Sequence, residues 1–350
     1  MKICVLACPA DTHARELARE IARISGAACS VFDLSLPPGV PVELSRSRLA
    51  WDEIDLSAFD RILVLGYEIE DPLVPRPVAS ADWSLWGIDY LIDQQRASFV
   101  ASALRDLERR GVSLVNGWHA LQFGLTKPRL LADLGRAGHR VPQWLCSNDM
   151  PVVQRFCEEQ GRVVWRPGAG RALWQRFEDR QRLDLVSPSK PPLLLASVAD
   201  GSLRRAYVCD GEVLLALDRT APGIDDFERM EVVSACDAAP IAAELASALH
   251  RVGAVWGEIS YVEDGGRPCI YDIDPDPRYG WLPAEFRSYL QVRLARKLLG
   301  LPLPGQSELP LPSSRERDSL FVRRMLVTLH EMEATKYAKE TEGAKDAGSG

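Results

Sequence analysis

Paired acidic side chains late in the chain are the residues best suited to chemistry. Residues 257–281 predict two strands joined by an Asp-Gly-Gly turn, which is a strong hairpin signal. Asp272 and Asp274 lie two positions apart on the returning strand, so their side chains share one face of the sheet. Glu258 and Ser260 share a face of the outgoing strand for the same reason. Carboxylates crowded on one face repel each other unless a cation lies between them.

Hard oxygen ligands of this kind suit magnesium, which commonly bridges to phosphates. We therefore predict a magnesium site formed by Asp272 and Asp274, with Glu258 as the carboxylate on the neighbouring strand. An acidic, solvated hairpin end is the alternative. The spacing also begins like a calcium loop, but its sixth position is Pro277 and its twelfth is not Glu, which excludes that site. Nucleotide-sugar transferases also carry Asp-x-Asp after a strand, where it holds a metal-diphosphate, and that interpretation stays open.

Cations and glycines precede the acidic hairpin in an order that suits a nucleoside triphosphate. Glycines let backbone amides approach phosphate closely. Cations neutralise phosphate oxygens, and a metal bridges them. An ordinary solvated surface charge is the alternative for each cation, and a simple turn for the glycines. The candidate residues are Lys127, Arg166, Gly168, Gly170, Arg205 and Arg219.

Composition narrows the class of protein. The chain has 350 residues, of which 46% are hydrophobic and 26% charged, as expected for a globular protein of two or three domains. Its net charge of -7 disfavours nucleic-acid binding, and no apolar run approaches the length of a membrane span. The eight cysteines include no Cys-x-x-Cys pair, and the N-terminus reads as a strand and not as a signal peptide. These features predict a cytoplasmic protein with reduced cysteines.

The elements that must position these residues follow from periodicity and turn signals. The first part of the chain predicts strands and helices in the β-α-β order of a small parallel sheet, with loop dominating residues 35–57 and 70–88. Gly-x-Gly-x-x-Gly is absent from the first turn, so a dinucleotide-binding domain is excluded. The predicted elements here are strands 2–8, 28–32, 61–65 and 112–115 and helices 14–24 and 94–109.

The second part predicts shorter strands, two hairpins and several amphipathic helices. Its predicted strands are 141–145, 162–165, 193–198, 205–209, 212–217 and the hairpin of 257–274. Its predicted helices are 127–134, 150–159, 238–249 and 286–299. We predict a domain at 1–117, a small lobe at 118–200, a large lobe at 201–312, and a C-terminal helix with a frayed tail at 313–350. That last helix would serve packing, a homo-oligomer or a partner protein.

The ordered motifs resemble the ATP-grasp superfamily, most closely the RimK-like carboxylate–amine ligases, over about residues 112–299. The stretch VNGWHALQFGLTKPRLLADLGRAGHRVPQW is similar to the family's Asn, Lys and Leu…Gly…Pro pattern. VVWRPGAG resembles the strand and glycine loop that carry the second nucleotide lysine, and CIYDIDPDP resembles the metal motif Glu-x-Asn-Pro. PADTHA and SNDMPVVQRF are similar to ATP-grasp maturases that cross-link ribosomal peptides.

The resemblance implies an α+β ATP-grasp fold preceded by a parallel α/β domain, with ATP and magnesium as cofactors. It implies that a small-molecule or peptide carboxylate is joined to an amine or hydroxyl through an acyl phosphate. It assigns nucleotide contacts to Lys127, Arg166, Gly168 and Gly170, adenine contacts to the hinge at Ser197 and Val198, and oxyanion stabilisation to Arg205 and Arg219.

Several positions depart from the family pattern. Arg166 replaces the second lysine, Asp272 and Asp274 replace Glu and Asn, and Ser260 replaces the first metal Asp. The hinge also lacks the usual Gln-Glu pair. A catalytically silent ATP-grasp protein that binds a peptide or partner as a scaffold is therefore the second functional hypothesis, and a nucleotide-sugar transferase is the third.

Overall fold

The computed structural model describes most of the chain up to residue 312. The described residues are 1–7, 12–34, 36, 39–65, 83–169, 174–177, 185–201, 203–219, 232–277, 279–280, 282–305 and 307–312. The side chain of Arg219 is not among the described parts. Gly170 and the predicted helix and tail of 313–350 also lie outside the described residues. Within the part that the structure describes, no helix is long and apolar enough to cross a membrane.

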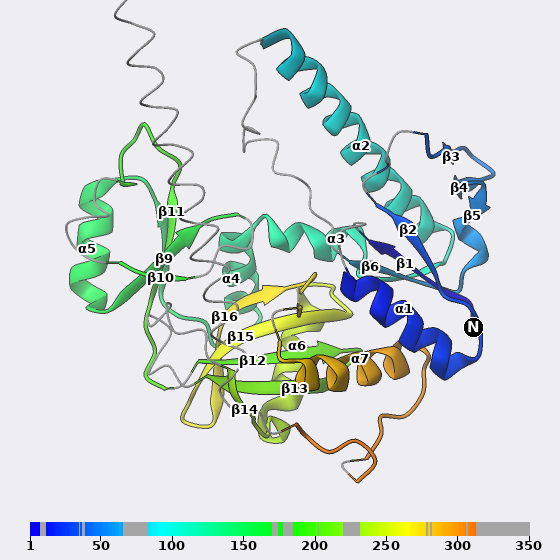
Figure 1. The fold of residues 1–350 in the computed structure, drawn as a ribbon. Coiled ribbons are helices and arrows are strands. Elements are labelled where there is room, and N and C mark those ends of the chain that lie inside the picture. The colour runs from blue at the N-terminus through cyan, green and yellow to red at the C-terminus, as the bar shows by residue number, and fades with distance from the viewer. Residues whose placement is uncertain are drawn as a thin grey trace, which may run out of the picture.

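The N-terminal part is built on the predicted parallel sheet (Figure 1). Its strand order is β2-β1-β6-β7, and every pairing is parallel. Apolar residues of α1 pack on one face of this sheet and those of α2 on the other. The elements are β1 (Ile3–Ala7), α1 (Thr12–Ser25), β2 (Ser30–Asp33), β6 (Arg61–Leu65), α2 (Trp83–Arg109) and β7 (Ser113–Val115).

Two predictions in this part were wrong. The predicted loop of 35–57 contains a small antiparallel sheet of β3 (Val42–Leu44), β4 (Leu49–Trp51) and β5 (Ile54–Asp55). All three residues of β4 are buried, and Trp51 packs against Phe99 of α2, so tertiary burial outweighs the polar local sequence. Helix α2 also begins at Trp83, eleven residues before the predicted start, which places part of the predicted 70–88 loop in the helix.

A second, antiparallel sheet has the strand order β10-β9-β11-β8. Its strands are β8 (Trp144–Ser147), β9 (Val163–Pro167), β10 (Gln175–Arg176) and β11 (Leu193–Ser197), and α5 (Met150–Gln160) joins β8 to β9. The predicted strand at 141–145 therefore begins three residues later, because pairing with β11 starts at Trp144, opposite Ala196. Three short elements precede this sheet in the chain: α3 (Trp118–Leu121), the 3-10 turn η2 (Gln122–Gly124) and α4 (Lys127–Arg136).

The third sheet holds both predicted hairpins in the order β14-β13-β12-β15-β16. This confirms that residues 205–219 and 257–274 belong to one antiparallel sheet. The strands are β12 (Leu203–Cys209), β13 (Glu212–Arg219), β14 (Val232–Ala235), β15 (Trp256–Asp264) and β16 (Arg267–Asp274). The helices here are α6 (Ala242–Arg251) and α7 (Ala284–Leu298), with short 3-10 turns η1 (Leu56–Ala58) and η4 (Ala239–Ile241) elsewhere.

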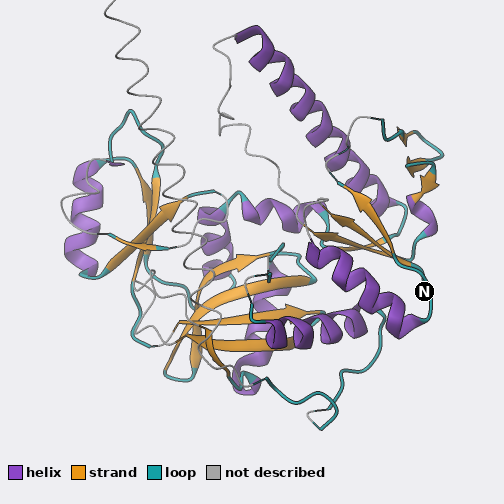
Figure 2. Ribbon diagram, in the orientation of Figure 1, coloured by secondary structure: helices purple, strands orange, loops and turns teal. Residues whose placement is uncertain are grey.

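Helices cover both faces of the five-stranded sheet (Figure 2). One face packs on α6 and on the apolar side of α4, through residues such as Leu130 and Ile259. The opposite face packs on α7, which also contacts α1 of the N-terminal part. Helix α4 contributes Leu131 to a further cluster with the second sheet, so this helix lies between the two antiparallel sheets. Each sheet falls within one predicted domain range, and the domain boundaries themselves stay a prediction.

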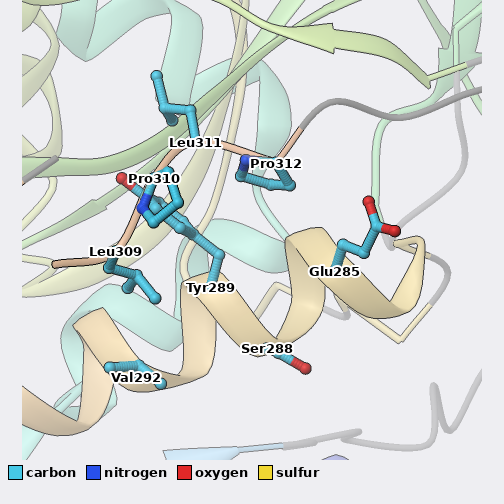
Figure 3. Close-up of a pocket in the computed structure, with 8 residues that line it drawn as sticks. All are labelled: Glu285, Ser288, Tyr289, Val292, Leu309, Pro310, Leu311 and Pro312. Atoms are coloured by element: carbon cyan, nitrogen blue, oxygen red, sulfur yellow. The ribbon is translucent and has the colours of Figure 1, made fainter. Parts of the chain in front are cut away.

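A separate groove lies between α7 and the segment that follows it (Figure 3). Its volume is about 420 Å³, and Tyr289, Val292 and residues 309–312 give it a mostly apolar lining. None of the predicted site residues lines it.

Candidate functional site: cations around the acidic hairpin

Two buried cations from different elements meet on Asp272. The Lys127 Nζ donates to Asp272 Oδ1 at 2.6 Å and to the Ile273 carbonyl at 2.9 Å. Arg166 Nη1 donates to the other carboxylate oxygen, Asp272 Oδ2, at 2.7 Å. Lys127 is 2% exposed and Arg166 is 1% exposed. Both are therefore fixed in a nearly dry site, and neither is an ordinary surface charge.

Local structure explains why these cations converge. Lys127 is the first residue of α4, and its amide donates to the Gly168 carbonyl at 3.1 Å, which ties the loop after β9 to the start of the helix. Arg166 lies on β9, opposite Leu194 of β11, with its guanidinium 5.6 Å from the centre of the Trp174 ring. The predicted nucleotide residues Lys127, Arg166 and Gly168 are thus brought together.

The electrostatics of the cluster favour an ionised carboxylate with positive charge left over. Burial opposes ionisation of Asp272, but the charges and hydrogen bonds of Lys127 and Arg166 outweigh it and lower the pKa of this carboxyl to about 2. One carboxylate facing two cations leaves one net positive charge in these three side chains. Such a surplus in a desolvated place attracts anions, including phosphate.

A second buried ion pair lies across the same sheet face. Arg205 Nη1 lies 3.0 Å from Glu258 Oε1, and both side chains are largely buried. The strand register places Arg205 opposite Ser260, and Ser260 opposite Asp272, so these three positions form a row over β12, β15 and β16. Burial raises the pKa of Glu258, and the charge of Arg205 opposes that rise. The register places Arg205, Asp272 and Asp274 of the predicted group on one face, and the Arg219 side chain lies outside the described parts.

The carboxylates of the hairpin offer the oxygen ligands that magnesium prefers, but they are not arranged as a metal site. Glu258 lies directly opposite Asp274 in the register, and Asp274 Oδ1 accepts a hydrogen bond from the Asp276 amide at 3.0 Å. Both oxygens of Asp272 accept from cations. Among the described residues, no three His, Cys, Asp or Glu side chains are placed to hold one metal ion. The metal role of Asp272, Asp274 and Glu258 stays a prediction.

The backbone groups of the predicted hinge form hydrogen bonds within the protein. Ser197 ends β11, and its amide donates to the Gln143 carbonyl at 2.8 Å while its Oγ accepts from the Gln143 amide at 3.1 Å. The Val198 amide donates to the Arg162 carbonyl at 3.0 Å. The Ser197 carbonyl accepts from the Tyr271 hydroxyl at 2.8 Å. The backbone donors of Ser197 and Val198, assigned to adenine from the sequence, are therefore engaged elsewhere.

Comparison with known proteins identifies this architecture through structure and not through sequence. No protein-family model matches the chain, and no curated protein matches its sequence. The ATP-grasp ligase PsnB, solved with minimal precursor, Mg and ADP, has a TM-score of 0.69 at 22% identity, covering 85% of this chain and 97% of that chain. The chain has the ATP-grasp fold.

Two further solved structures support the same assignment. The macrocyclase MdnC from Microcystis aeruginosa MRC, bound with precursor peptide MdnA, has a TM-score of 0.64 at 14% identity and covers 85% of this chain and 99% of that chain. A RimK domain ATP-grasp protein from Sphaerobacter thermophilus DSM 20745 has a TM-score of 0.54 at 17% identity, covering 86% and 100%. At these identities the likeness concerns the fold, which confirms the fold class expected from the sequence.

Asn116, which the sequence placed in the family's Asn and Lys pattern without a role, fixes the acidic hairpin within the ATP-grasp fold. Asn116 is fully buried at the end of β7, and its Oδ1 accepts from the Val255 amide at 2.6 Å and the Trp256 amide at 2.9 Å. Its Nδ2 donates to the Trp256 carbonyl at 2.6 Å and also to the Pro275 carbonyl. One amide thereby links the N-terminal sheet to the start of β15 and the end of β16. The available signal was a single Asn after an apolar strand.

Proposed function

We propose that this protein is an ATP-dependent ligase that joins a carboxylate to an amine or hydroxyl through an acyl phosphate. The observation that carries the proposal is the meeting of Lys127 and Arg166, two buried cations from separate elements, on one carboxylate beside the acidic hairpin. A cation pair of this kind is suited to bind the phosphates of a nucleotide. The ATP-grasp fold supports this assignment.

The proposed reaction has two steps. A substrate carboxylate oxygen attacks the γ-phosphorus of ATP, the bond to the β-phosphate oxygen breaks, and ADP leaves. An amine or hydroxyl then attacks the acyl carbon, loses its proton, and releases phosphate. Lys127 and Arg166 would hold phosphate oxygens, and Arg205 would stabilise the negative oxygen that develops at the acyl carbon. Arg219 is proposed for the same oxyanion role from its place in the sequence.

Asp272 and Asp274 would hold magnesium through carboxylate oxygens. Glu258, the third ligand predicted from the sequence, is already paired with Arg205 at 3.0 Å. When bound, magnesium would neutralise part of the charge on the phosphate oxygens. The chain's own contribution is to keep Asp272 ionised, since its low pKa leaves a negative ligand at neutral pH. Structures of PsnB hold Mg with ADP, which supports the same ion here.

We propose a peptide as the substrate class. PsnB was solved with a precursor peptide, and MdnC is a macrocyclase bound with its precursor peptide. A third similar structure is an ATP-grasp ligase in complex with ADP and a leader and core peptide, at 14% identity and a TM-score of 0.63. Acidic side chains within such a peptide would supply the carboxylate, and its lysine, serine or threonine side chains the nucleophile.

Calorimetry with magnesium-ATP, followed by an assay of ADP release, tests this proposal. The ligase is expected to bind magnesium-ATP and to release ADP only when a carboxylate-bearing peptide is present. Lys127→Ala is the variant expected to bind magnesium-ATP more weakly, and Arg129→Ala, an exposed cation on the same helix, is the control expected to behave as the parent. ADP release without any carboxylate substrate would contradict ligation.

A scaffold that binds a peptide without catalysis is the second candidate. The observation that favours it is the engagement of both Asp272 oxygens and of the hinge donors within the protein. A scaffold would bind a precursor peptide with an affinity that magnesium-ATP does not change. The nucleotide-sugar transferase hypothesis receives no support from the similar structures, which are ATP-grasp proteins.

A further inference from the structure

The hinge presents a carbonyl and an amide that converge on one hydroxyl group. The Tyr271 hydroxyl donates to the Ser197 carbonyl at 2.8 Å and accepts from the Ala199 amide at 2.7 Å. The two backbone groups are two residues apart and point to the same place. A carbonyl beside an amide is complementary to the edge of adenine, whose N6 amino group donates and whose N1 accepts. Tyr271 therefore fills both positions that an adenine edge would use.

A strand irregularity directs Tyr271 to the hinge. In the pairing of β15 with β16, Ser260 lies opposite Asp272 and Tyr261 lies opposite Ile270, so the register passes over Tyr271. An extra residue in one strand bends it and turns a side chain away from the regular alternation. Tyr271 is 1% exposed and packs in the cluster that includes residues of the second sheet, so its hydroxyl is held in a dry place.

The hinge contact is joined to the cation cluster through one aromatic ring. The Trp174 ring lies edge-on to Tyr271, with ring centres 6.1 Å apart, and the Arg166 guanidinium lies 5.6 Å from the same ring centre. Asp272, which both cations bind, is the next residue after Tyr271. Trp174 thus contacts both the tyrosine at the hinge and one of the two cations.

We propose that Tyr271 determines the base specificity of the nucleotide site by occupying the hinge pair that would otherwise read adenine. This inference rests on the proposed nucleotide-dependent function. An adenine edge that reaches the hinge must displace the hydroxyl, and the exchange leaves a buried hydroxyl to be satisfied elsewhere, so the net gain is small. The phosphate cations then supply most of the affinity, and the parent protein discriminates weakly between ATP and GTP.

Removal of the Tyr271 hydroxyl should make the site prefer ATP over GTP. A free carbonyl and amide accept the adenine edge and oppose guanine, whose O6 accepts and whose N1 donates. Tyr271→Leu removes the hydroxyl and the ring, and Tyr271→Phe removes the hydroxyl alone while keeping the packing against Trp174. Tyr261→Leu is the matched control, because Tyr261 is a fully buried tyrosine of the same sheet that packs in the α6 cluster, away from the hinge.

Calorimetric titration of magnesium-ATP and magnesium-GTP into parent, Tyr271→Leu, Tyr271→Phe and Tyr261→Leu tests the assignment. We expect Tyr271→Leu to bind ATP at least tenfold more tightly than the parent and to favour ATP over GTP at least tenfold more strongly. Tyr271→Phe should shift both values in the same direction, and thermal unfolding identifies the variants that are folded. Tyr261→Leu should keep the parent's ATP-to-GTP ratio.

The outcomes separate this inference from the proposed function. Nucleotide binding that depends on Lys127, with the same ATP-to-GTP ratio in the parent and in both Tyr271 variants, overturns the role of Tyr271 alone. Strong adenine preference in the parent that falls in Tyr271→Phe also overturns it. No nucleotide binding by any folded protein in the series overturns both the role of Tyr271 and the nucleotide-dependent function.

Discussion

The cation cluster and the hinge are two ends of one candidate nucleotide site, and the protein's own side chains occupy both. At the cluster, Asp272 accepts from Lys127 and Arg166. At the hinge, the Tyr271 hydroxyl serves both the Ser197 carbonyl and the Ala199 amide. Asp272 is an anion where a phosphate would bind, whereas Tyr271 is a neutral group where a base would bind.

The difference lies in what each occupant leaves unsatisfied. Asp272 cancels one of two positive charges, so the cluster still attracts an anion through a charge-assisted interaction. The Tyr271 hydroxyl satisfies the Ala199 amide and the Ser197 carbonyl, so neither backbone group needs a ligand as a partner. A ligand should therefore be held mainly by its phosphates, and the cluster should matter more than the hinge for both stability and affinity.

The largest expected effect follows from removal of the anion in the cluster. Asp272→Asn leaves Lys127 and Arg166 buried without a carboxylate, and loss of one partner from a buried ion pair costs roughly 3–5 kcal/mol. We expect a loss of that size in the free energy of unfolding in urea at pH 7. Asp264→Asn is the control, because its side chain is more exposed and its partner Arg140 is exposed, so its loss should be below about 1 kcal/mol.

The cluster should make the free energy of unfolding depend on pH in the acid range, and the hinge should not. The pKa of Asp272 is lowered to about 2 in the folded protein, against about 3.9 in an unfolded chain. A depressed carboxyl pKa contributes stability above pH 4 that is lost as the pH falls toward 2, and here the contribution is roughly 2 kcal/mol. Urea unfolding of the metal-free protein between pH 5 and pH 2 should show this loss in the parent and not in Asp272→Asn. Equal slopes in the two proteins would contradict the ion pairs.

A smaller effect is expected on ligand affinity. Lys127→Ala removes one of the two cations that would hold phosphates, and should weaken binding of magnesium-ATP at least tenfold, which is about 1.4 kcal/mol. Arg166 still pairs with Asp272 in this variant, so the fold should persist. The loss should be greater for ATP than for AMP, since AMP carries fewer phosphates. Unchanged affinity for ATP in calorimetry would show that Lys127 serves the fold alone.

The sequence predicted the part of the site that depends on strand geometry. The alternation of strand residues placed Asp272 with Asp274 and Glu258 with Ser260, and both hairpins do lie in one sheet. The convergence of Lys127 on Asp272 could not be read from periodicity, because the two residues are 145 positions apart and meet only through the packing of α4 against β16. The family resemblance gave Lys127 a nucleotide contact and Asp272 a metal role, and it predicted no contact between the two.

The hydrogen bonds at the hinge could not be predicted from the sequence. Ser197 and Val198 were assigned to adenine, but the Ser197 carbonyl accepts from the Tyr271 hydroxyl, and Tyr271 reaches it through a strand irregularity that no turn residue indicates. The sheet of β3, β4 and β5 was missed for a related reason, because its strands are two or three residues long and are stabilised by the burial of Trp51 and Leu49. Short or irregular strands depend on tertiary contacts, whereas long alternating strands are visible in the sequence.

The smallest expected effect concerns Ser260, the position between the two ion pairs. Ser260 lies opposite Arg205 on one side and Asp272 on the other. A carboxylate at this position would add an anionic oxygen ligand to the face that carries Asp272 and Asp274. Since Glu258 already pairs with Arg205 at 3.0 Å, we expect it not to supply the missing ligand.

Ser260→Asp should therefore strengthen the magnesium-dependent part of ATP binding by a few-fold, about 1 kcal/mol, in a magnesium titration at fixed ATP. Ser260→Asn, of matching size without the charge, should leave it unchanged. Glu258→Gln should lower the free energy of unfolding by breaking the pair with Arg205 and should leave the magnesium dependence as in the parent. If Glu258→Gln instead weakens magnesium-dependent binding while Ser260→Asp has no effect, Glu258 is the replacement ligand. The neutral hinge would be unaffected in either case, because a carboxylate added at the phosphate end changes the charge there and leaves the Tyr271 hydrogen bonds in place.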